Sequence, residues 1–303
     1  MNLLKINFLI APLFTLALFT VPTVLADNSA LPSEPEKQSE SVNTTIPKIQ
    51  SSVTEQTAEK RKKLVADATS ALNEANNALK FLEQKKTDEA LDALARATGK
   101  LELVVARDPK LALAPVNVSV QSFDLFATPE TTKAYISLAK ELMDDGDIQK
   151  VRPLIENLAS EVVIRTTNIP LATYPSAIKK VTPLIDDGKI DEAKAALQAA
   201  LNTLVITDKV IPLPVLRAEI FLEEAEKLAE NKKRSDEESD KLAAYLADTK
   251  AQLEMADLLG YGDKKAFKPM FKQLREIEQK TEDKSSGKGW FKKIRQQISE
   301  LVE

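Results

Sequence analysis

The chain contains an internal repeat of a helical hairpin, and this repeat constrains its fold more than any other feature. Residues 142–148 (LMDDGDI) match residues 184–190 (LIDDGKI) at an offset of 42 residues. The match continues without a gap to Ile178 and Ile220, with 11 identities in 37 aligned pairs, where chance gives roughly 2. Each copy reads as a helix, a tight polar turn, a second helix and an apolar exit.

A weaker copy of the same unit is found earlier in the chain. Residues 88–90 (DEA) match residues 191–193 (DEA) at an offset of 103 residues. Hairpin repeats stack on one another, because a single hairpin cannot bury its apolar face alone. The copies are unevenly spaced, and this favours a bundle of hairpins over a regular solenoid.

Apolar residues recur at helical spacing along most of the chain after residue 52. The clearest stripe comprises Leu64, Ala68, Ala71, Leu72, Ala75, Ala78, Leu79 and Leu82. Only 7 of the 303 residues are Gly, which is few for a sheet protein with many tight turns. Gly146 and Gly260 follow helical segments, where a left-handed cap favours Gly. The predicted class is all-α, a compact bundle of repeated antiparallel helical hairpins.

One stretch departs from the helical pattern. Val116, Val118 and Val120 alternate with polar residues, so the fold leaves room for one short extended segment near 115–121. Thr128 and Pro129 then open a helix that Gly146 closes. Further helices are expected near residues 148–165, 175–187, 190–206, 214–231, 236–259, 264–281 and 289–302.

The first 26 residues have the pattern of a secretory signal: a positive charge at Lys5, an apolar run, and small residues before a cleavage site. We expect cleavage after Ala26 and a periplasmic protein. An uncleaved membrane anchor is the alternative, because about 20 apolar residues can span a bilayer. Residues 27–51 are rich in Ser, Pro, Glu and Thr, and we expect a disordered acidic tether. Residues 52–262 then form the main helical domain, and residues 263–303 form C-terminal helices with a basic amphipathic end.

The chain has no His and no Cys. This excludes a Cys nucleophile, a disulfide, a thiolate zinc site, a haem held by His and a His-centred triad. The sequence also lacks an EF-hand loop, a phosphate-binding glycine loop and a dinucleotide-binding glycine fingerprint. Its net charge of −4 argues against nucleic-acid binding. We expect no metal, no cofactor and no enzymatic activity.

Four residues are candidates for ligand binding: Glu161, Arg165, Tyr174 and Asn117. Glu161 and Arg165 are spaced for an i,i+4 pair on a helix, and a structural salt bridge is favoured over a ligand clamp. Tyr174 lies in the rigid apolar connector 169–175, which either lines a pocket or packs between repeats. Asn117 is a polar residue of the extended stretch.

The C-terminal end combines apolar and basic residues in one helical segment. Trp290 and Phe291 begin an apolar face, and Lys292 and Lys293 flank it. A basic amphipathic helix can lie on an anionic membrane or dock on a partner. Docking on its own bundle is the default interpretation, and a peripheral membrane contact is the alternative.

The chain resembles the bacterial YfdX family in five short segments: residues 114–118 (APVNV), 160–162 (SEV), 170–175 (PLATYP), 211–214 (IPLP) and 258–262 (LLGYG). The resemblance implies a helix-rich protein of the Gram-negative periplasm, often a homo-oligomer, that is associated with stress such as acid or antimicrobial exposure. It implies no catalytic activity and brings no defined functional residues.

We expect a non-enzymatic protein whose work is binding, either of client proteins under stress in a chaperone-like role or of small amphipathic molecules. The alternative is a helical scaffold for protein–protein assembly at the envelope. A ligand-dependent rise in melting temperature separates a small-molecule site from the other two functions.

The absence of His predicts how the protein responds to acid. Its 46 Asp and Glu residues are the abundant groups that titrate on the acid side. Carboxylates that are paired in the fold have depressed pKa values, so the stability they contribute is present at neutral pH and lost as pH falls through those values. We predict loosened packing or subunit dissociation from about pH 5 downward, with helicity largely kept. Light scattering and circular dichroism between pH 8 and pH 3 test this, and a sharp transition between pH 6 and pH 7 would contradict it.

Overall fold

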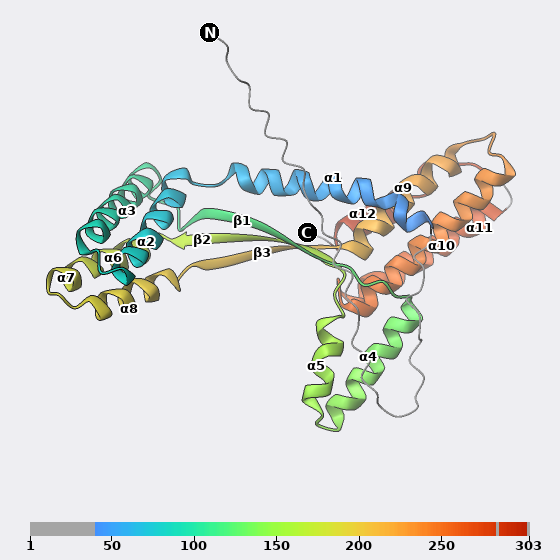
Figure 1. Ribbon diagram of the computed structural model, residues 1–303. Helices are drawn as coiled ribbons and strands as arrows, with labels where there is room; N and C mark the ends of the chain where they lie inside the picture. The colour runs from blue at the N-terminus through green and yellow to red at the C-terminus, as the bar shows by residue number, and fades with distance from the viewer. Residues whose placement is uncertain (1–39, 283–284, 302–303) are drawn as a thin grey trace, which may run out of the picture. The chain divides into compact units, whose positions relative to one another are not determined.

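The computed structural model describes residues 40–282 and 285–301 (Figure 1). Helices hold 69% of these residues, and the remaining regular structure is one three-stranded antiparallel sheet. The predicted helical class is confirmed, and so is the extended segment. The predicted signal segment and residues 27–39 lie outside the described residues. No helix in the described ranges is both long and apolar enough to cross a bilayer.

The internal repeat appears in the order of the elements, because each helical hairpin leads into one strand. The first unit comprises α2 (Ala66–Glu83), α3 (Thr87–Arg107) and β1 (Leu113–Phe123). The second comprises α4 (Pro129–Asp144), α5 (Ile148–Glu156) and β2 (Glu161–Pro170). The third comprises α7 (Val181–Asp186), α8 (Ile190–Leu201) and β3 (Val205–Pro212), with the short α6 (Tyr174–Lys179) before it. Gly146 and Gly188 take the left-handed conformation in the turns of the second and third hairpins.

The three strands pair in chain order, β1-β2-β3, and both pairs are antiparallel. Consecutive units therefore enter the sheet from opposite ends. The α2–α3 and α7–α8 hairpins precede strands that start at the same end of the sheet. The α4–α5 hairpin precedes the strand that starts at the other end.

The helix expected near 148–165 ends at residue 156, and residues 161–165 belong to β2. β-Branched residues dominate this segment, and they favour a strand over a helix. β2 is the central strand and is buried over much of its length, so its pattern does not alternate and resembles that of a buried helix. The third strand likewise replaces the end of the helix expected near 190–206.

The first and third hairpins share one hydrophobic core. Small side chains on α2, including Ala68, Ala71 and Ala75, are fully buried, and α2 contacts both α3 and α8. Leu94 and Leu101 of α3 and Leu197 of α8 fill the same core. Alanine at the contact lets the helix axes approach closely, so the Ala-rich stripe of the sequence marks the seam between hairpins.

A second core is built by the C-terminal helices α9 (Leu213–Glu230), α10 (Asp236–Leu259), α11 (Lys264–Glu282) and α12 (Lys292–Ser299). Ser235 and Glu238 form a capping box at the start of α10, and Gly260 ends that helix in the left-handed conformation. Both features follow from the sequence. The boundary expected between residues 262 and 263 falls inside this core. Residues before and after it contribute side chains, so α11 and α12 pack with α9 and α10.

The expectation of a tether over residues 27–51 is wrong for residues 40–51. These residues form the first half of α1 (Glu40–Lys62), which buries Val42, Ile49 and Val53. Ile49 and Val53 pack on one face of the sheet with Val118, Val162 and Ile164. The polar composition of the segment conceals an apolar stripe at helical spacing.

Charged side chains also hold α1 against α9. Lys48 Nζ lies 3.0 Å from Glu223 Oε2 and 2.6 Å from Glu224 Oε1. The ammonium groups of Lys227 and Lys48 lower the pKa of Glu223 below its ordinary value of 4.5, and Lys48 lowers the pKa of Glu224 in the same way. The stability these pairs contribute is present above about pH 4.5 and is lost as pH falls through the depressed values. Glu223 and Glu224 are among the carboxylates on which the predicted acid response depends.

Candidate functional site

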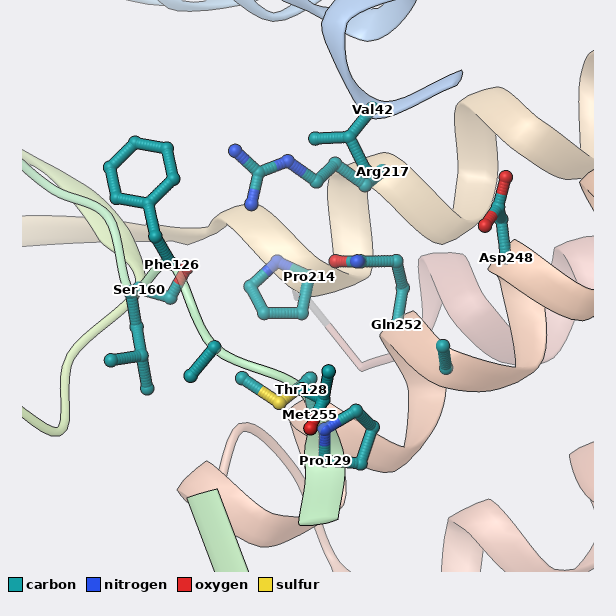
Figure 2. Close-up of a pocket in the computed structure, with 13 residues that line it drawn as sticks. Val42, Phe126, Thr128, Pro129, Ser160, Pro214, Arg217, Asp248, Gln252 and Met255 are labelled. Atoms are coloured by element: carbon teal, nitrogen blue, oxygen red, sulfur yellow. The ribbon is translucent and has the colours of Figure 1, made fainter. Parts of the chain in front are cut away.

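A pocket of about 220 Å³ lies where the sheet meets α9 and α10. Its wall is mainly apolar, and Figure 2 shows the side chains that line it. The apolar lining comprises Val42, Leu125, Phe126, Ala127, Pro129, Pro214, Ala251 and Met255. The polar lining comprises Thr128, Ser160, Arg217, Asp248 and Gln252. An apolar wall with a few polar groups is the usual character of a small-molecule site.

Arg217 is the buried charge of this pocket, with 5% of its surface exposed. It is the only charged residue among the first six of α9, a stretch that is otherwise apolar. Its Nη1 donates to Asp124 Oδ1 at 3.0 Å, and its Nη2 donates to Asp124 Oδ2 at 2.6 Å. The bidentate geometry compensates the buried charge. The buried Nε–H has no hydrogen-bond partner among the described residues, so Arg217 retains one unused donor.

Ser160 joins the chain segments that meet at the pocket. Its Oγ donates to Asp124 Oδ1 at 3.2 Å, and its backbone N–H donates to Tyr261 Oη at 2.9 Å. Its carbonyl accepts from the N–H of Leu213, at the start of α9, at 2.9 Å. Burial raises the pKa of Tyr261, and the nearby Glu161 carboxylate raises it further, so the phenol stays neutral. These bonds fix the pocket wall at the point where β1 ends and β2 begins.

The α10 side of the pocket carries Asp248, Gln252 and Met255. Asp248 accepts a hydrogen bond from the Ser41 hydroxyl of α1. In Figure 2 the side chains of Arg217 and Gln252 extend to the same side, toward the segment that carries Phe126. Because Asp124 neutralises Arg217, Asp248 leaves a net charge of −1 on the charged lining residues taken together with Asp124.

Two of the polar groups that line the pocket are hydroxyls. Its hydroxyls belong to Thr128 and Ser160, and Ser160 Oγ donates to a carboxylate that already binds Arg217. No group of three acidic residues that could hold a metal ion occurs among the described residues.

Glu161 and Arg165 do not form the predicted helical pair. Both lie on β2, where residues four apart are separated by about 13 Å along the strand. Arg165 instead makes a bidentate pair with Asp208 of β3, at 2.8 and 2.7 Å. The Arg165 guanidinium lowers the pKa of the Asp208 carboxyl. The salt bridge of Arg165 is therefore with Asp208 and not with Glu161. Glu161 lies next to the pocket residue Ser160.

The other two candidates lie away from the pocket. Tyr174 is fully buried in the core of the first and third hairpins, and burial raises the pKa of its hydroxyl. Tyr174 therefore packs between repeats and does not line a pocket, which is one of the two alternatives given for the connector 169–175. Asn117 is exposed on β1, opposite Thr167 of β2. The four predicted residues are therefore not brought together.

The C-terminal segment docks on the protein's own bundle. Phe291 is fully buried in the core of α9–α12, together with Ile294 and Ile298. Trp290 packs against this core, and Lys280 Nζ lies 5.6 Å from the centroid of its ring. The apolar face is therefore not available to a membrane or a partner in this conformation. Lys292 and Lys293 are exposed.

The pocket residues were not found from the sequence, although one signal was present. A lone Arg among apolar residues at a helix start indicates a buried charge that needs a partner. Its partner, Asp124, is 93 residues away in the chain. Only the pairing of β1 with β2 and the placement of α9 bring the two together.

Comparison with known proteins assigns part of the chain to a family. The family model described as YfdX protein matches residues 71–210. These residues belong to the YfdX family. The YfdX region includes the three hairpins and most of the sheet, whereas Arg217 and α10 lie beyond it. No curated protein matches the sequence.

A solved structure is also similar to this chain. The crystal structure of YfdX from Salmonella Typhi is 18% identical in sequence, with a TM-score of 0.34. The alignment covers 50% of this chain and 93% of that chain.

Removing Asp124 tests whether the buried ion pair holds the site together. Asp124→Asn leaves the Arg217 charge buried without a counter-charge. We predict a loss of about 3 kcal/mol in the free energy of unfolding, at the lower end for buried pairs, because the Asp124 side chain is 23% exposed. Asp208→Asn, which breaks the more exposed pair with Arg165, is the matched control and should lose much less. Urea denaturation measures the free energy of unfolding of both variants. Equal losses would contradict the conclusion that the Asp124–Arg217 pair holds the site together.

Proposed function

We propose that this protein is a non-enzymatic, stress-associated binding protein of the periplasm that takes small amphipathic molecules into the pocket beside Arg217. The observation that carries the proposal is a mainly apolar pocket of about 220 Å³ whose wall carries a few polar side chains, among them Arg217 and Gln252. The apolar lining suits the body of such a molecule, and Arg217, Gln252 and Thr128 suit its polar end.

The Nε–H of Arg217 has no accessible surface, so it is not a contact point for a ligand. The affinity comes from burial of the ligand's apolar surface against the apolar lining. The net negative charge near the pocket favours neutral or cationic molecules over anionic ones. The proposed ligand is therefore a neutral or cationic amphipathic molecule.

The periplasmic location rests on the signal pattern of the first 26 residues and on the relationship of residues 71–210 to the YfdX family. The second candidate function is a helical scaffold for assembly at the envelope. The repeated hairpins favour it, because such units present extended helical faces to partners. A scaffold binds a partner protein but gives no stabilisation by a small ligand.

Two dyes with one ring system test the site and its charge preference. N-phenyl-1-naphthylamine is neutral, and 1-anilinonaphthalene-8-sulfonate adds one negative charge to the same rings. We predict that the neutral dye binds more tightly, raises the melting temperature and shows enhanced fluorescence. Asp248→Asn should increase the affinity for the anionic dye relative to the neutral one, because it removes the uncompensated charge.

A pocket-filling variant localises the binding. Ala251→Phe places a ring in the pocket and should weaken binding of the neutral dye at least about tenfold, which corresponds to about 1.4 kcal/mol. Ala243→Phe adds the same ring at an exposed position of α10, away from the pocket, and should leave binding unchanged. If both variants bind the dye as the unchanged protein does, the pocket is not the binding site.

A further inference from the structure

Positive charge is concentrated in the first part of α11. Residues 264–275 contain no acidic residue and carry a net charge of +5, from Lys264, Lys265, Lys268, Lys272 and Arg275. The whole chain has a net charge of −4, so all the other residues together carry −9. The charges of this protein are therefore segregated, and the first part of α11 is basic on an otherwise acidic molecule.

The five cations lie on one side of the helix. Successive residues of an α-helix are rotated by about 100°, so the five positions fall within an arc of about 100°. All five side chains are exposed, whereas Phe267, Met270 and Leu274 point into the core of α9–α12 and are buried. We refer to the five cations together as the basic face of α11.

Contacts within the protein do not account for the basic face. Lys272 Nζ lies 3.8 Å from Glu276 Oε1, and the other four cations make no ion pair within the described residues. Asp263 precedes the helix, but its carboxylate accepts from the backbone N–H of Lys265 rather than from an ammonium group. Lys264 and Lys265 also lie in the first turn, where the helix dipole disfavours positive charge. Folding therefore does not favour this arrangement, whereas an external anionic surface does.

The shape of the basic face fits an extended anionic surface. Residues 264–275 span about 17 Å along the helix axis. Clusters of four to eight Lys and Arg residues on an amphipathic helix are typical of attachment to anionic lipids. The apolar side of α11 is covered by the protein's own core, so such attachment uses charge without insertion of apolar side chains.

We propose that the basic face of α11 binds the surface of a membrane that contains anionic phospholipids. The signal pattern of the first 26 residues is the route by which the protein reaches such a surface. This binding differs from the contact considered for Trp290 and Phe291, because it leaves the apolar face of the C-terminal segment in the core.

Co-sedimentation of the purified protein with vesicles tests the proposal. We expect binding at low ionic strength to vesicles of equal parts phosphatidylglycerol and phosphatidylcholine, and none to phosphatidylcholine alone. Salt at about 1 M, where the screening length is about 3 Å, should release the protein. Because the whole chain is negatively charged, its net charge predicts repulsion, so binding must come from a local basic surface. Absence of binding to both kinds of vesicle, or equal binding to both, would overturn the proposal.

A triple variant localises the attachment to α11. Lys264→Gln with Lys265→Gln and Lys268→Gln removes three of the five charges and should weaken binding to the mixed vesicles about 100-fold. The three side chains are exposed and make no ion pair, so the urea midpoint should not fall. Lys272→Gln with Arg275→Gln gives a second variant if the triple variant does not fold.

A matched control separates the basic face from overall charge. Lys110→Gln with Lys133→Gln and Lys140→Gln removes the same charge at exposed positions outside the C-terminal helices. This control should bind the mixed vesicles nearly as tightly as the unchanged protein does. Equal weakening by the control and by the variants of α11 would overturn the proposal.

The single Trp of the chain reports how the protein attaches. Trp290 packs against the core of α9–α12, so binding through charge alone should leave its emission unchanged. Brominated acyl chains should not quench it. Quenching by these lipids would show that the C-terminal segment inserts, and it would contradict attachment through the basic face of α11.

Discussion

Antiparallel pairing of the three strands is the constraint on which the rest of the structure depends. Each strand continues a helical hairpin, so the order β1-β2-β3 decides which end of the sheet each hairpin occupies. The first and third hairpins meet and bury an Ala- and Leu-rich core. β3 then leads directly into α9, and α1 covers one face of the sheet. Packing of hairpins is thus a consequence of strand pairing rather than of helix periodicity alone.

The pocket depends on the same pairing. Asp124 and Ser160 lie at the adjoining ends of β1 and β2, and Arg217 lies in the helix that follows β3. The buried ion pair and the hydrogen bonds of Ser160 therefore join three successive units of the chain. This location explains why a binding site can form where the YfdX region meets the C-terminal helices, although those helices lie outside the family match.

The sequence predicts local features well and long-range features poorly. The turn at Gly146, the left-handed cap at Gly260 and the alternating valines of β1 depend on neighbouring residues, and all are confirmed. The sequence pattern places residues 161–165, the first half of β2, in a helix, because a strand buried on both faces has no alternation. The sequence does not predict the first half of α1, residues 40–51, because Pro47 and many Ser and Thr residues mask a short apolar stripe. The ion pair of Arg217 with Asp124 joins residues 93 apart, and no local pattern reveals such a pair.

Native-state hydrogen exchange tests the central role of the sheet most directly. β2 is hydrogen-bonded on both edges, so its amides should exchange only when the whole unit unfolds. Protection of the β2 amides, for example those of Ile164 and Ile169, should match that of α2 and α3 and exceed that of α4 and α5 in the monomeric form. Exchange of the β2 amides as fast as that of α4 and α5 would contradict the account, because the strands would then be a consequence of helix packing rather than its framework.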